Sequence, residues 1–329
     1  MTRVALPHDV RTLQNDFPGF RNLGNTCFLN AVLQCMFHCE PLGADLLNNP
    51  DMTGIVERTV RAVFAEYIAS DASTVDVIAP IDVVNELKRQ VGFTFGRQQD
   101  AAECLRHLLH YTGLGHRHCD AHAEMVDGSV VLSYTPEAAQ VSVAAGAIDA
   151  RALLLEATTG DVGLKHAPAV LAIRINNIYE QGDEEFWVDV HVDWPKEAFT
   201  VTIGNEAAPQ AQYSVQSYLT HRREEGASVS RGMRSGHYVA YFQHDGSWYL
   251  ADDAKVTLLT EAPQEFPYIV FLTRSNCLGD NHMGAMRKRI QNMKRFRKRA
   301  VVMLSHIVEQ EARVGMVVHR TVRTIAIAT

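Results

Sequence analysis

The chain has 329 residues, enough to bury a large hydrophobic core in one or two domains. Its residues are 47% hydrophobic and 21% charged, which is typical of a soluble globular protein and excludes a disordered or fibrous chain. Six cysteines are too few for a disulfide scaffold, so we expect a reducing, intracellular compartment, cytoplasmic or nuclear. We expect no secretory signal and no transmembrane segment, because neither apolar pattern occurs.

The charge is distributed unevenly along the sequence. From residue 275 to the end there are 11 Lys and Arg against 3 Asp and Glu, which leaves 20 basic and 35 acidic residues in the rest. An acidic body suits a basic partner, and a basic tail suits an anionic one. An acidic surface also serves solubility alone, and the charge by itself favours this plainer explanation.

The stretch from Gly19 to Cys39 predicts a central, buried helix that begins near Cys27. Asn25 and Thr26 are residues of the kind that cap helix N-termini. The run that follows is apolar on most sides and contains no Pro or Gly. Because a helix N-terminus favours the thiolate form of a cysteine, Cys27 is a candidate nucleophile. The alternative is a small core residue, the commonest fate of a free cysteine.

Two amphipathic helices follow within the first hundred residues, and another begins near Asp100. Its first turn carries Asp100 and Glu103, and its apolar stripe continues to Leu109. The two acids complement the helix dipole, which is the plainer explanation of their position. Alternatively, they form an acidic lip that receives a basic peptide.

Residues 113–167 are the least informative part of the sequence, although a strand is expected within 141–148. His116, His118, Cys119 and His122 are metal-ligating residue types, but their spacing fits no zinc pattern and the chain has no CxxC pair. We therefore predict no metal and no other cofactor.

From Pro168 the hydrophobic period changes to two, which predicts a β-rich C-terminal part. The polar segment 222–235 predicts a mobile loop, and GHY at 236–238 follows it at once. Asp245-Gly246 is a strong β-hairpin signal, with a return strand from residue 247.

This hairpin predicts which side chains share a face. If its loop has two residues, His237 has Asp252 as its diagonal neighbour, and Asp253 points to the opposite face. A carboxylate diagonal to a histidine is placed to orient the imidazole ring. A three-residue loop would reverse the assignment and favour Asp253. The alternative for His237 is an ordinary strand histidine.

The basic tail is densest between Arg287 and Arg299, where eight Lys and Arg interleave with apolar residues at roughly helical spacing. Nucleic acid, an anionic lipid surface, an import receptor or a partner helix would each suit the segment 287–299. A solvated basic helix without a partner is an equally plain explanation.

A nucleophilic cysteine needs a base, and the base needs a group that orients it. Cys27, His237 and Asp252 supply these three residue types. Their separation in sequence is no obstacle, because such residues meet only in the fold.

Three segments, in this order, closely resemble the sequence boxes of the ubiquitin-specific proteases, a family of papain-like cysteine peptidases. They are NLGNTCFLN at 22–30, QQDAAE at 98–103, and GHY at 236–238 followed by Trp248 and Asp252-Asp253. The resemblance covers about residues 19–274. It implies an α+β fold of the papain-like cysteine peptidase type, with thumb, palm and fingers.

The domains implied by this resemblance follow the chain in order. After a lead-in over residues 1–18, the catalytic domain spans 19–274. It comprises a helical thumb over about 19–115, shortened fingers over about 116–167, and a palm over about 168–274 that is an antiparallel sheet. Residues 275–329 form the basic tail, expected to be helical in part.

By the same resemblance, Cys27 is the nucleophile, His237 the general base, and Asp252 its orienting carboxylate. Asp253 is a second carboxylate that assists, and Asn22 donates its side-chain amide to the oxyanion. The expected substrate-binding residues are Asp100, Glu103, Gln98, Gly236, Tyr238 and Trp248. The implied reaction hydrolyses the bond after the C-terminal Gly-Gly of ubiquitin through a thioester. Ubiquitin or ubiquitinated proteins are therefore the expected partners, and the two acids meet arginines of the ubiquitin tail.

Several features depart from the family pattern. The paired CxxC zinc ligands of the fingers are missing, Cys104 replaces a usual Phe, and the loop at 222–235 is long. Two alternatives stay open, because the fingers normally hold the ubiquitin body and because a misaligned catalytic triad would not show in the sequence. One is a protease for another Gly-Gly modifier or a polyprotein, and the other is a catalytically weak module that docks ubiquitin.

Overall fold

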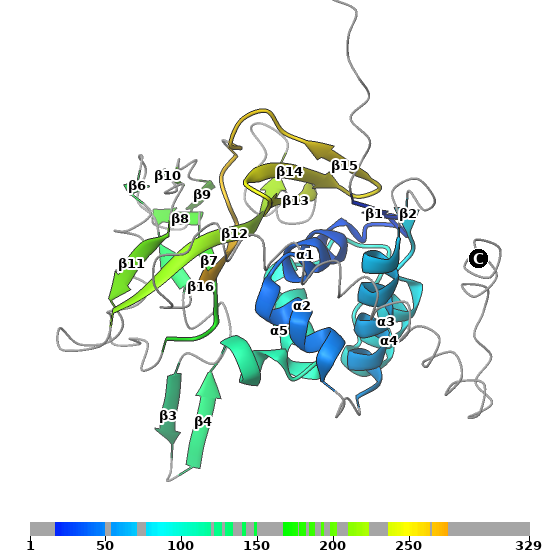
Figure 1. The fold of residues 1–329 in the computed structure, drawn as a ribbon, viewed down its shortest axis with the longest axis horizontal. Coiled ribbons are helices and arrows are strands. Elements are labelled where there is room, and N and C mark those ends of the chain that lie inside the picture. Colours follow the sequence, from blue (N-terminus) through cyan, green and yellow to red (C-terminus); the bar gives the residue numbers. More distant parts are fainter. Residues whose placement is uncertain are drawn as a thin grey trace, which may run out of the picture.

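The computed structural model has helices on one side and a sheet on the other (Figure 1). It describes residues 17–49, 54–70, 77–119, 167–176, 178–181, 184–187, 192–193, 198–202, 210–223, 236–263 and 265–275, and the strands at 122–126, 129–133, 140–142 and 148–149. The predicted tail at 287–299 and most of the lead-in therefore lie outside the described residues. No described helix is long and apolar enough to cross a membrane.

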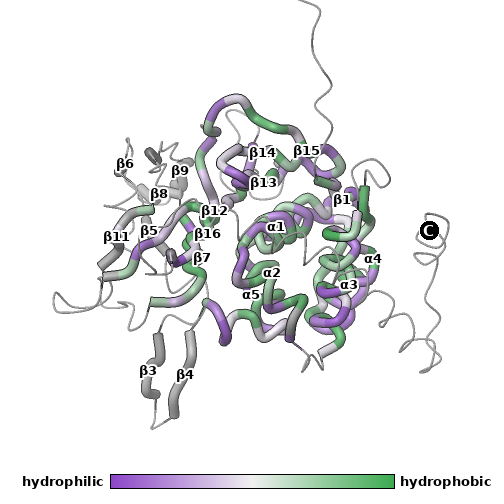
Figure 2. The backbone as a smooth tube through the Cα atoms, in the orientation of Figure 1, coloured by the Kyte–Doolittle hydropathy of each residue, from purple (hydrophilic) through white to green (hydrophobic). Residues whose placement is uncertain are grey.

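The N-terminal part is helical, as its hydrophobic period predicts. Its helices are α1 (Cys27–Phe37), α2 (Glu40–Asn48), α3 (Ile55–Ala69), α4 (Ile81–Val91) and α5 (Ala101–Tyr111), followed by the π-helical turn η1 (Gly115–Cys119). The short strands β1 (Gly19–Phe20) and β2 (Val77–Ile78) pair in parallel beside them. Hydrophobic and hydrophilic stretches alternate along the helices (Figure 2), which is the pattern of helices with one buried side.

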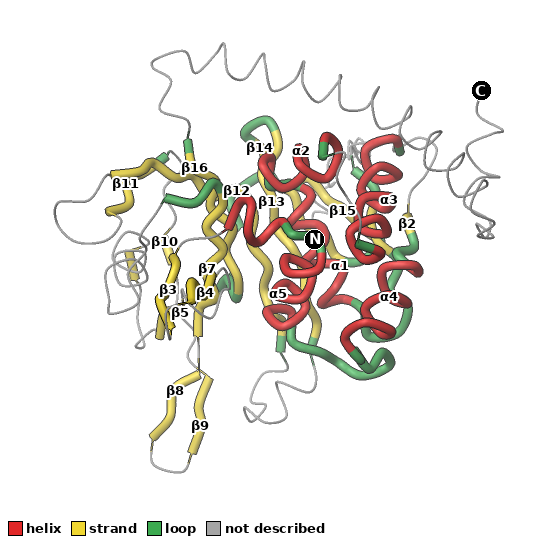
Figure 3. The backbone as a smooth tube through the Cα atoms, turned by 90° about the horizontal axis from the view of Figure 1, so that it is seen from below, coloured by secondary structure: helices red, strands yellow, loops and turns green. Residues whose placement is uncertain are grey.

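The C-terminal part forms an eight-stranded sheet, mostly antiparallel, in the order β15-β14-β13-β12-β16-β7-β5, with β11 paired to β12. Its strands are β5 (Gln140–Ser142), β7 (Val170–Asn176), β11 (Phe199–Thr202), β12 (Gln210–Arg222), β13 (His237–His244), β14 (Ser247–Asp252), β15 (Lys255–Leu258) and β16 (Ile269–Arg274). Three small ribbons pair β3 (His122–Val126) with β4 (Ser129–Ser133), β8 (Ile178–Gln181) with β9 (Glu184–Trp187), and β6 (Ile148–Asp149) with β10 (Val192–Asp193). Figure 3 shows the helices gathered beside the strands of the large sheet.

Helix α1 joins the two sides of the molecule. All of its residues are buried, which confirms the predicted central helix, and it packs against β13 and α5. Phe17, just before β1, completes the junction, because its ring lies edge-on to those of His38, Phe242 and Tyr249. Helix α1, which begins with Cys27, is therefore packed directly against the hairpin that carries His237.

The start of α1 differs in detail from the prediction. Thr26 is the N-cap residue, but its side chain makes no capping hydrogen bond. Its Oγ1 instead accepts from the backbone N–H of Leu23, at 2.8 Å. Asn22 Oδ1 accepts from the backbone N–H groups of Gly24 and Thr26, at 3.0 and 3.2 Å. These bonds fold the preceding loop and leave the helix N-terminus without a side-chain cap.

One loop boundary was also predicted wrongly. Arg222 was assigned to a mobile loop because it opens a polar run, but it is the last residue of β12 and pairs with His237. The polar composition was misleading because this strand end lies at a partly exposed edge, where charged side chains are compatible with pairing.

Candidate active site

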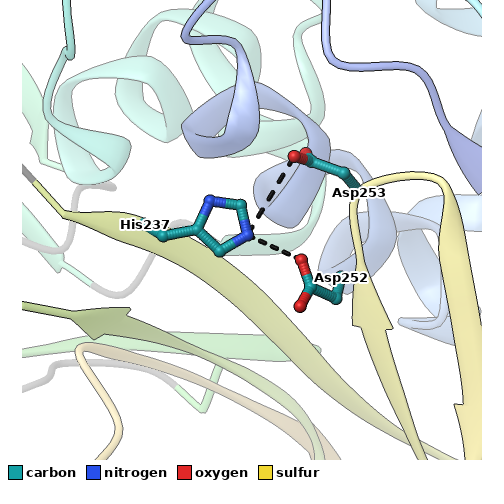
Figure 4. Close-up of side chains that lie close together, drawn as sticks. All are labelled: His237, Asp252 and Asp253. Carbon is teal, nitrogen blue, oxygen red and sulfur yellow. Dashed lines mark hydrogen bonds and ion pairs between the residues drawn. The ribbon is translucent and has the colours of Figure 1, made fainter.

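The hairpin of β13 and β14 places His237 beside Asp252. Its turn consists of Asp245 and Gly246, both with positive φ (48° and 76°), and the strands pair directly on either side. The prediction of a two-residue loop is therefore confirmed. His237 Nε2 lies 2.6 Å from Asp252 Oδ1 (Figure 4).

Cys27 is the first residue of α1 and is only 3% exposed. The pKa of His237 is raised to about 9, chiefly through its hydrogen bond with Cys27. Burial of the ring opposes this rise, and the hydrogen bond with Asp252 adds to it. Because Nε2 is engaged by Asp252, Nδ1 is the ring nitrogen left for the sulfur. The arrangement favours the imidazolium form of His237 and places the Cys27 sulfur at the positive end of a helix.

Asp253 does not point away from His237, so this prediction was wrong. Strand β14 ends at Asp252, and Asp253 has a left-handed φ of 47°, so the alternation of faces does not extend to it. Its carboxylate turns back, and Oδ2 lies 4.0 Å from His237 Nε2 (Figure 4). It accepts hydrogen bonds from Asn22 Nδ2 at 2.8 Å and from Asn30 Nδ2 at 2.7 Å.

Asn22 is exposed and lies beside Asp253. Its Oδ1 is used by the loop before α1, and its Nδ2 donates to Asp253. An amide nitrogen carries two hydrogens, and within the described residues one hydrogen bond from this nitrogen is recorded. The bond to Asp253 therefore uses one of the two hydrogens of this amide.

The segment QQDAAE at 98–103 links the part of the chain that carries Cys27 to the part that carries His237. Gln98 Nε2 donates to the carbonyl oxygen of Gly236 at 2.8 Å and lies 3.8 Å from Cys27 Sγ. Gly236 has a φ of 125°, and a Cβ there would lie 2.6 Å from His221 Nε2 and 2.7 Å from the carbonyl oxygen of Arg222. Only glycine fits this position. Gln98 and Gly236 therefore help to hold the catalytic triad of Cys27, His237 and Asp252 in place, in addition to any contact with substrate.

The two predicted acidic residues differ in their availability. Asp100 caps α5, accepting from the N–H of Ala102 at 2.6 Å, and both its oxygens accept from the Tyr268 hydroxyl at 2.9 Å. The side chain of Glu103 is 48% exposed and has only loose ion pairs of 3.8 to 4.0 Å within its own helix. Asp100 is thus largely engaged within the fold, and Glu103 is the accessible carboxylate.

Tyr238 and Trp248 lie in packed positions. Tyr238 is buried, and its ring stacks on that of His221 with centroids 4.4 Å apart. Trp248 pairs with Gln243 near the turn of the hairpin, at the opposite end from His237, and contacts the ring of Tyr218. The structure does not bring Trp248 to the triad.

One of the predicted metal-ligating residue types, His118, has a structural partner. His118 Nε2 lies 2.6 Å from Asp45 Oδ2, which also accepts from Arg117 Nε at 2.8 Å. Within the described part of the chain, the one group of ligand types close enough to share a cation is His237, Asp252 and Asp253. The hydrogen bond between His237 and Asp252 and the bond from Asn22 to Asp253 already engage all three side chains.

Asn30 and Gly19 support the site but had no assigned role. Asn30 follows Cys27 by one helical turn, a spacing that places both on one face and could have been recognised from the sequence. Gly19 lies so close to the backbone of Ala254 that an added Cβ would be 2.2 Å from its carbonyl carbon. The adjacent Phe20 N–H donates to the carbonyl oxygen of Asp253 at 2.7 Å, so β1 anchors the turn that carries this carboxylate.

A comparison with known protein families adds the decisive observation. The sequence profile of the ubiquitin carboxyl-terminal hydrolase family matches residues 18–272. The chain belongs to this family. The relationship to ubiquitin-specific proteases that the three sequence boxes predicted is thereby confirmed.

Individual ubiquitin carboxyl-terminal hydrolases match over different lengths. Ubiquitin carboxyl-terminal hydrolase 25 of Arabidopsis thaliana is 26% identical over 321 residues, which cover 78% of this chain and 47% of the relative. Ubiquitin carboxyl-terminal hydrolase 42 of Homo sapiens is 38% identical over 98 residues, which cover 28% of this chain and 7% of the human protein. The chain thus spans less than half the length of these relatives.

Solved structures show the same fold at low sequence identity. The SAGA DUB module bound to monoubiquitin aligns with a TM-score of 0.58 and 14% identity, over 83% of this chain and 72% of that chain. An essential yeast splicing factor aligns with a TM-score of 0.58 and 16% identity, over 80% and 70%. The predicted α+β fold, with helices followed by a mainly antiparallel sheet, is therefore confirmed as that of the family.

Proposed function

We propose that this protein is a cysteine-dependent deubiquitinase that hydrolyses the peptide or isopeptide bond after the C-terminal Gly-Gly of ubiquitin. The observation that carries the proposal is His237, which engages Asp252 through Nε2 and Cys27 through its hydrogen bond, in a chain of this family. A nucleophile, a base and an orienting carboxylate in contact are the requirements of thiol catalysis.

The reaction follows from the placement of these groups. The Cys27 thiolate attacks the carbonyl carbon of the terminal glycine, and the carbonyl π electrons move onto oxygen. Asn22 Nδ2 and the backbone N–H of Cys27 stabilise this oxyanion, and such donors contribute roughly 3 kcal/mol each to transition states. The His237 imidazolium gives its proton to the leaving lysine amine as the C–N bond breaks.

The second half of the reaction reverses the roles. The carbonyl carbon is then bound to sulfur as a thioester. Neutral His237 takes a proton from water, whose oxygen attacks the thioester. The C–S bond breaks, the sulfur leaves as the Cys27 thiolate, and His237 is again protonated. The new carboxylic acid of the terminal glycine loses the second water proton to solvent, and ubiquitin leaves as the carboxylate.

A second candidate function is a module that binds ubiquitin with little or no turnover. It stays a candidate because the fold is shared by an essential yeast splicing factor, and a fold by itself does not determine activity. A third candidate is cleavage after another Gly-Gly modifier, because the fingers predicted at 116–167 are short and lack the paired CxxC ligands of the family.

Labelling with ubiquitin that bears a C-terminal thiol-reactive group tests the proposal. We expect the wild-type protein to form a covalent adduct, and Cys27→Ala to form none, because the warhead occupies the position of the scissile carbonyl. The same probe built on other Gly-Gly modifiers is the control for substrate class. Labelling by another modifier alone would move the assignment to the third candidate, and absence of any labelling would favour the binding module.

The raised pKa of His237 predicts the alkaline limit of activity. A histidine with a pKa of about 9 stays protonated well above its ordinary value of 6.5, so the general acid is lost only as the pH rises through about 9. We therefore expect kcat/KM for a fluorogenic ubiquitin substrate to fall with a midpoint near pH 9, since this parameter reports groups of the unliganded enzyme. A fall centred near pH 7 would contradict the raised pKa of His237 as the source of the alkaline limit.

A further inference from the structure

We propose that Arg222 is a positioning residue for the triad, holding the outer oxygen of Asp252 while Glu265 holds Arg222. The inference rests on the proposed thiol chemistry, and it assigns a role to two residues that lie outside the three sequence boxes. Its basis is a row of side chains across three adjacent strands, together with the ion pair between Arg222 and Glu265, which lies in the segment before β16.

The sheet brings Arg222, His237 and Asp252 into one row. Arg222 is the last residue of β12 and lies directly opposite His237, the first residue of β13. Asp252 is the last residue of β14, on the other side of β13 and diagonal to His237. Opposite and diagonal neighbours share a face, so all three side chains lie on one surface of the sheet.

The two oxygens of Asp252 have different partners. Oδ1 accepts from His237 Nε2 at 2.6 Å, and Oδ2 lies 3.5 Å from Arg222 Nη1. The side chain of Asp252 is 39% exposed, so packing alone does not fix its rotamer. A cation on the second oxygen restricts rotation of the carboxylate and keeps the first oxygen directed at the imidazole ring.

The guanidinium of Arg222 is itself held in place. Its Nε lies 3.1 and 3.0 Å from the two oxygens of Glu265, and its Nη2 also pairs with Glu265 Oε1. Nη2 further donates to the Tyr241 hydroxyl at 3.2 Å, and that hydroxyl donates to Glu265 Oε1 at 2.6 Å. Because these hydrogen bonds fix the planar guanidinium of Arg222, its Nη1 is presented to Asp252 in one orientation.

Charge balance gives this arrangement a distinct signature. The charged and titratable groups around His237 are Cys27 of α1, His221 and Arg222 of β12, Asp252 of β14, Asp253 after it, Tyr241 of β13 and Glu265 before β16. Removing Arg222 leaves the carboxylates of Asp252 and Glu265 without their shared cation, which stabilises the imidazolium. Removing the charge of Glu265 leaves the Arg222 cation uncompensated, and this positive charge destabilises the His237 imidazolium.

The test measures the alkylation rate of Cys27 by iodoacetamide as a function of pH, with the modified site located by mass spectrometry. This readout requires no ubiquitin. The alkylation rate should change as His237 loses its proton at alkaline pH, and the midpoint of this change is the alkaline transition. For Arg222→Ala we expect this midpoint to move up by about half a pH unit, and for Glu265→Gln down by a similar amount. Arg222→Lys keeps the charge, so its transition should stay near that of the wild type.

Turnover of a fluorogenic ubiquitin substrate provides the second readout. We expect Arg222→Ala to lower kcat about tenfold with KM changed less than about twofold, since a loosened orienting group acts on the chemical step. Arg222→Lys should recover part of this loss. Arg89→Ala is the matched control, because Arg89 makes a similar fork with Glu86 on α4, at 3.0 and 2.7 Å, and should match the wild type in both readouts.

The outcomes separate this inference from the proposed function. Opposite shifts in Arg222→Ala and Glu265→Gln would support the positioning role even if no ubiquitin substrate were turned over. Unshifted transitions in both variants of an active enzyme would overturn the role of Arg222 and leave the deubiquitinase assignment standing. A shift in the same direction in both variants would indicate a general disturbance and would also overturn it.

Discussion

Replacing Cys27 by alanine is expected to lower turnover of a ubiquitin conjugate by on the order of 10⁵-fold, as removal of a catalytic nucleophile does in proteases. No other described cysteine can take its place. Burial raises the pKa of Cys35, Cys104 and Cys119, and that of Cys39 to about 12, so these thiols stay protonated inside the core. Cys27 alone among them lies at a helix N-terminus beside a histidine.

The same variant should still bind ubiquitin. Cys27 is nearly buried, and its loss removes one sulfur without altering the surface around it. Calorimetry with ubiquitin would measure the affinity, and initial rates with a fluorogenic conjugate would measure turnover. Cys119→Ala, in the η1 turn away from the hairpin, is the control and should keep its activity. Substantial hydrolysis by Cys27→Ala would remove the thiol mechanism altogether.

The second large effect is expected at Asp252. Asp252→Ala should lower kcat on the order of 10³-fold, because His237 loses the partner that orients the ring and stabilises its charge. Asp253→Ala should cost about tenfold to a hundredfold, through Asn22 and the oxyanion, since one oxyanion donor contributes about that much or more. The physical basis is the distance to His237 Nε2, which is 2.6 Å from Asp252 and 4.0 Å from Asp253.

The conservative variant separates orientation from charge. Asp252→Asn keeps an oxygen that can accept from His237 Nε2, so we expect its kcat to lie between those of the wild type and Asp252→Ala. Thermal unfolding of each variant would show that the fold is intact. If Asp253→Ala proved the more damaging substitution, the carboxylate next to the hairpin, and not the one within it, would be the orienting group.

Much of the site was predictable because it depends on local chemistry. The turn at Asp245-Gly246 needs two residues with positive φ, and those residues set the register that joins His237 to Asp252. The apolar run after Cys27 likewise marks a helix that is buried on every side. In both cases neighbouring residues decide the outcome, so the one-dimensional pattern carries the information.

Only the tertiary structure decided how this core of the site is held. Asn22 bonds Asp253 across 231 positions, and Gln98 bonds Gly236 across 138. The turn of Asp253 toward His237 and the end of β12 at Arg222 likewise depend on which strands pair and where the pairing stops. The sequence by itself determined the chemical types and the hairpin. Contacts between distant segments determined which carboxylates are engaged, because such contacts depend on packing that no local pattern encodes.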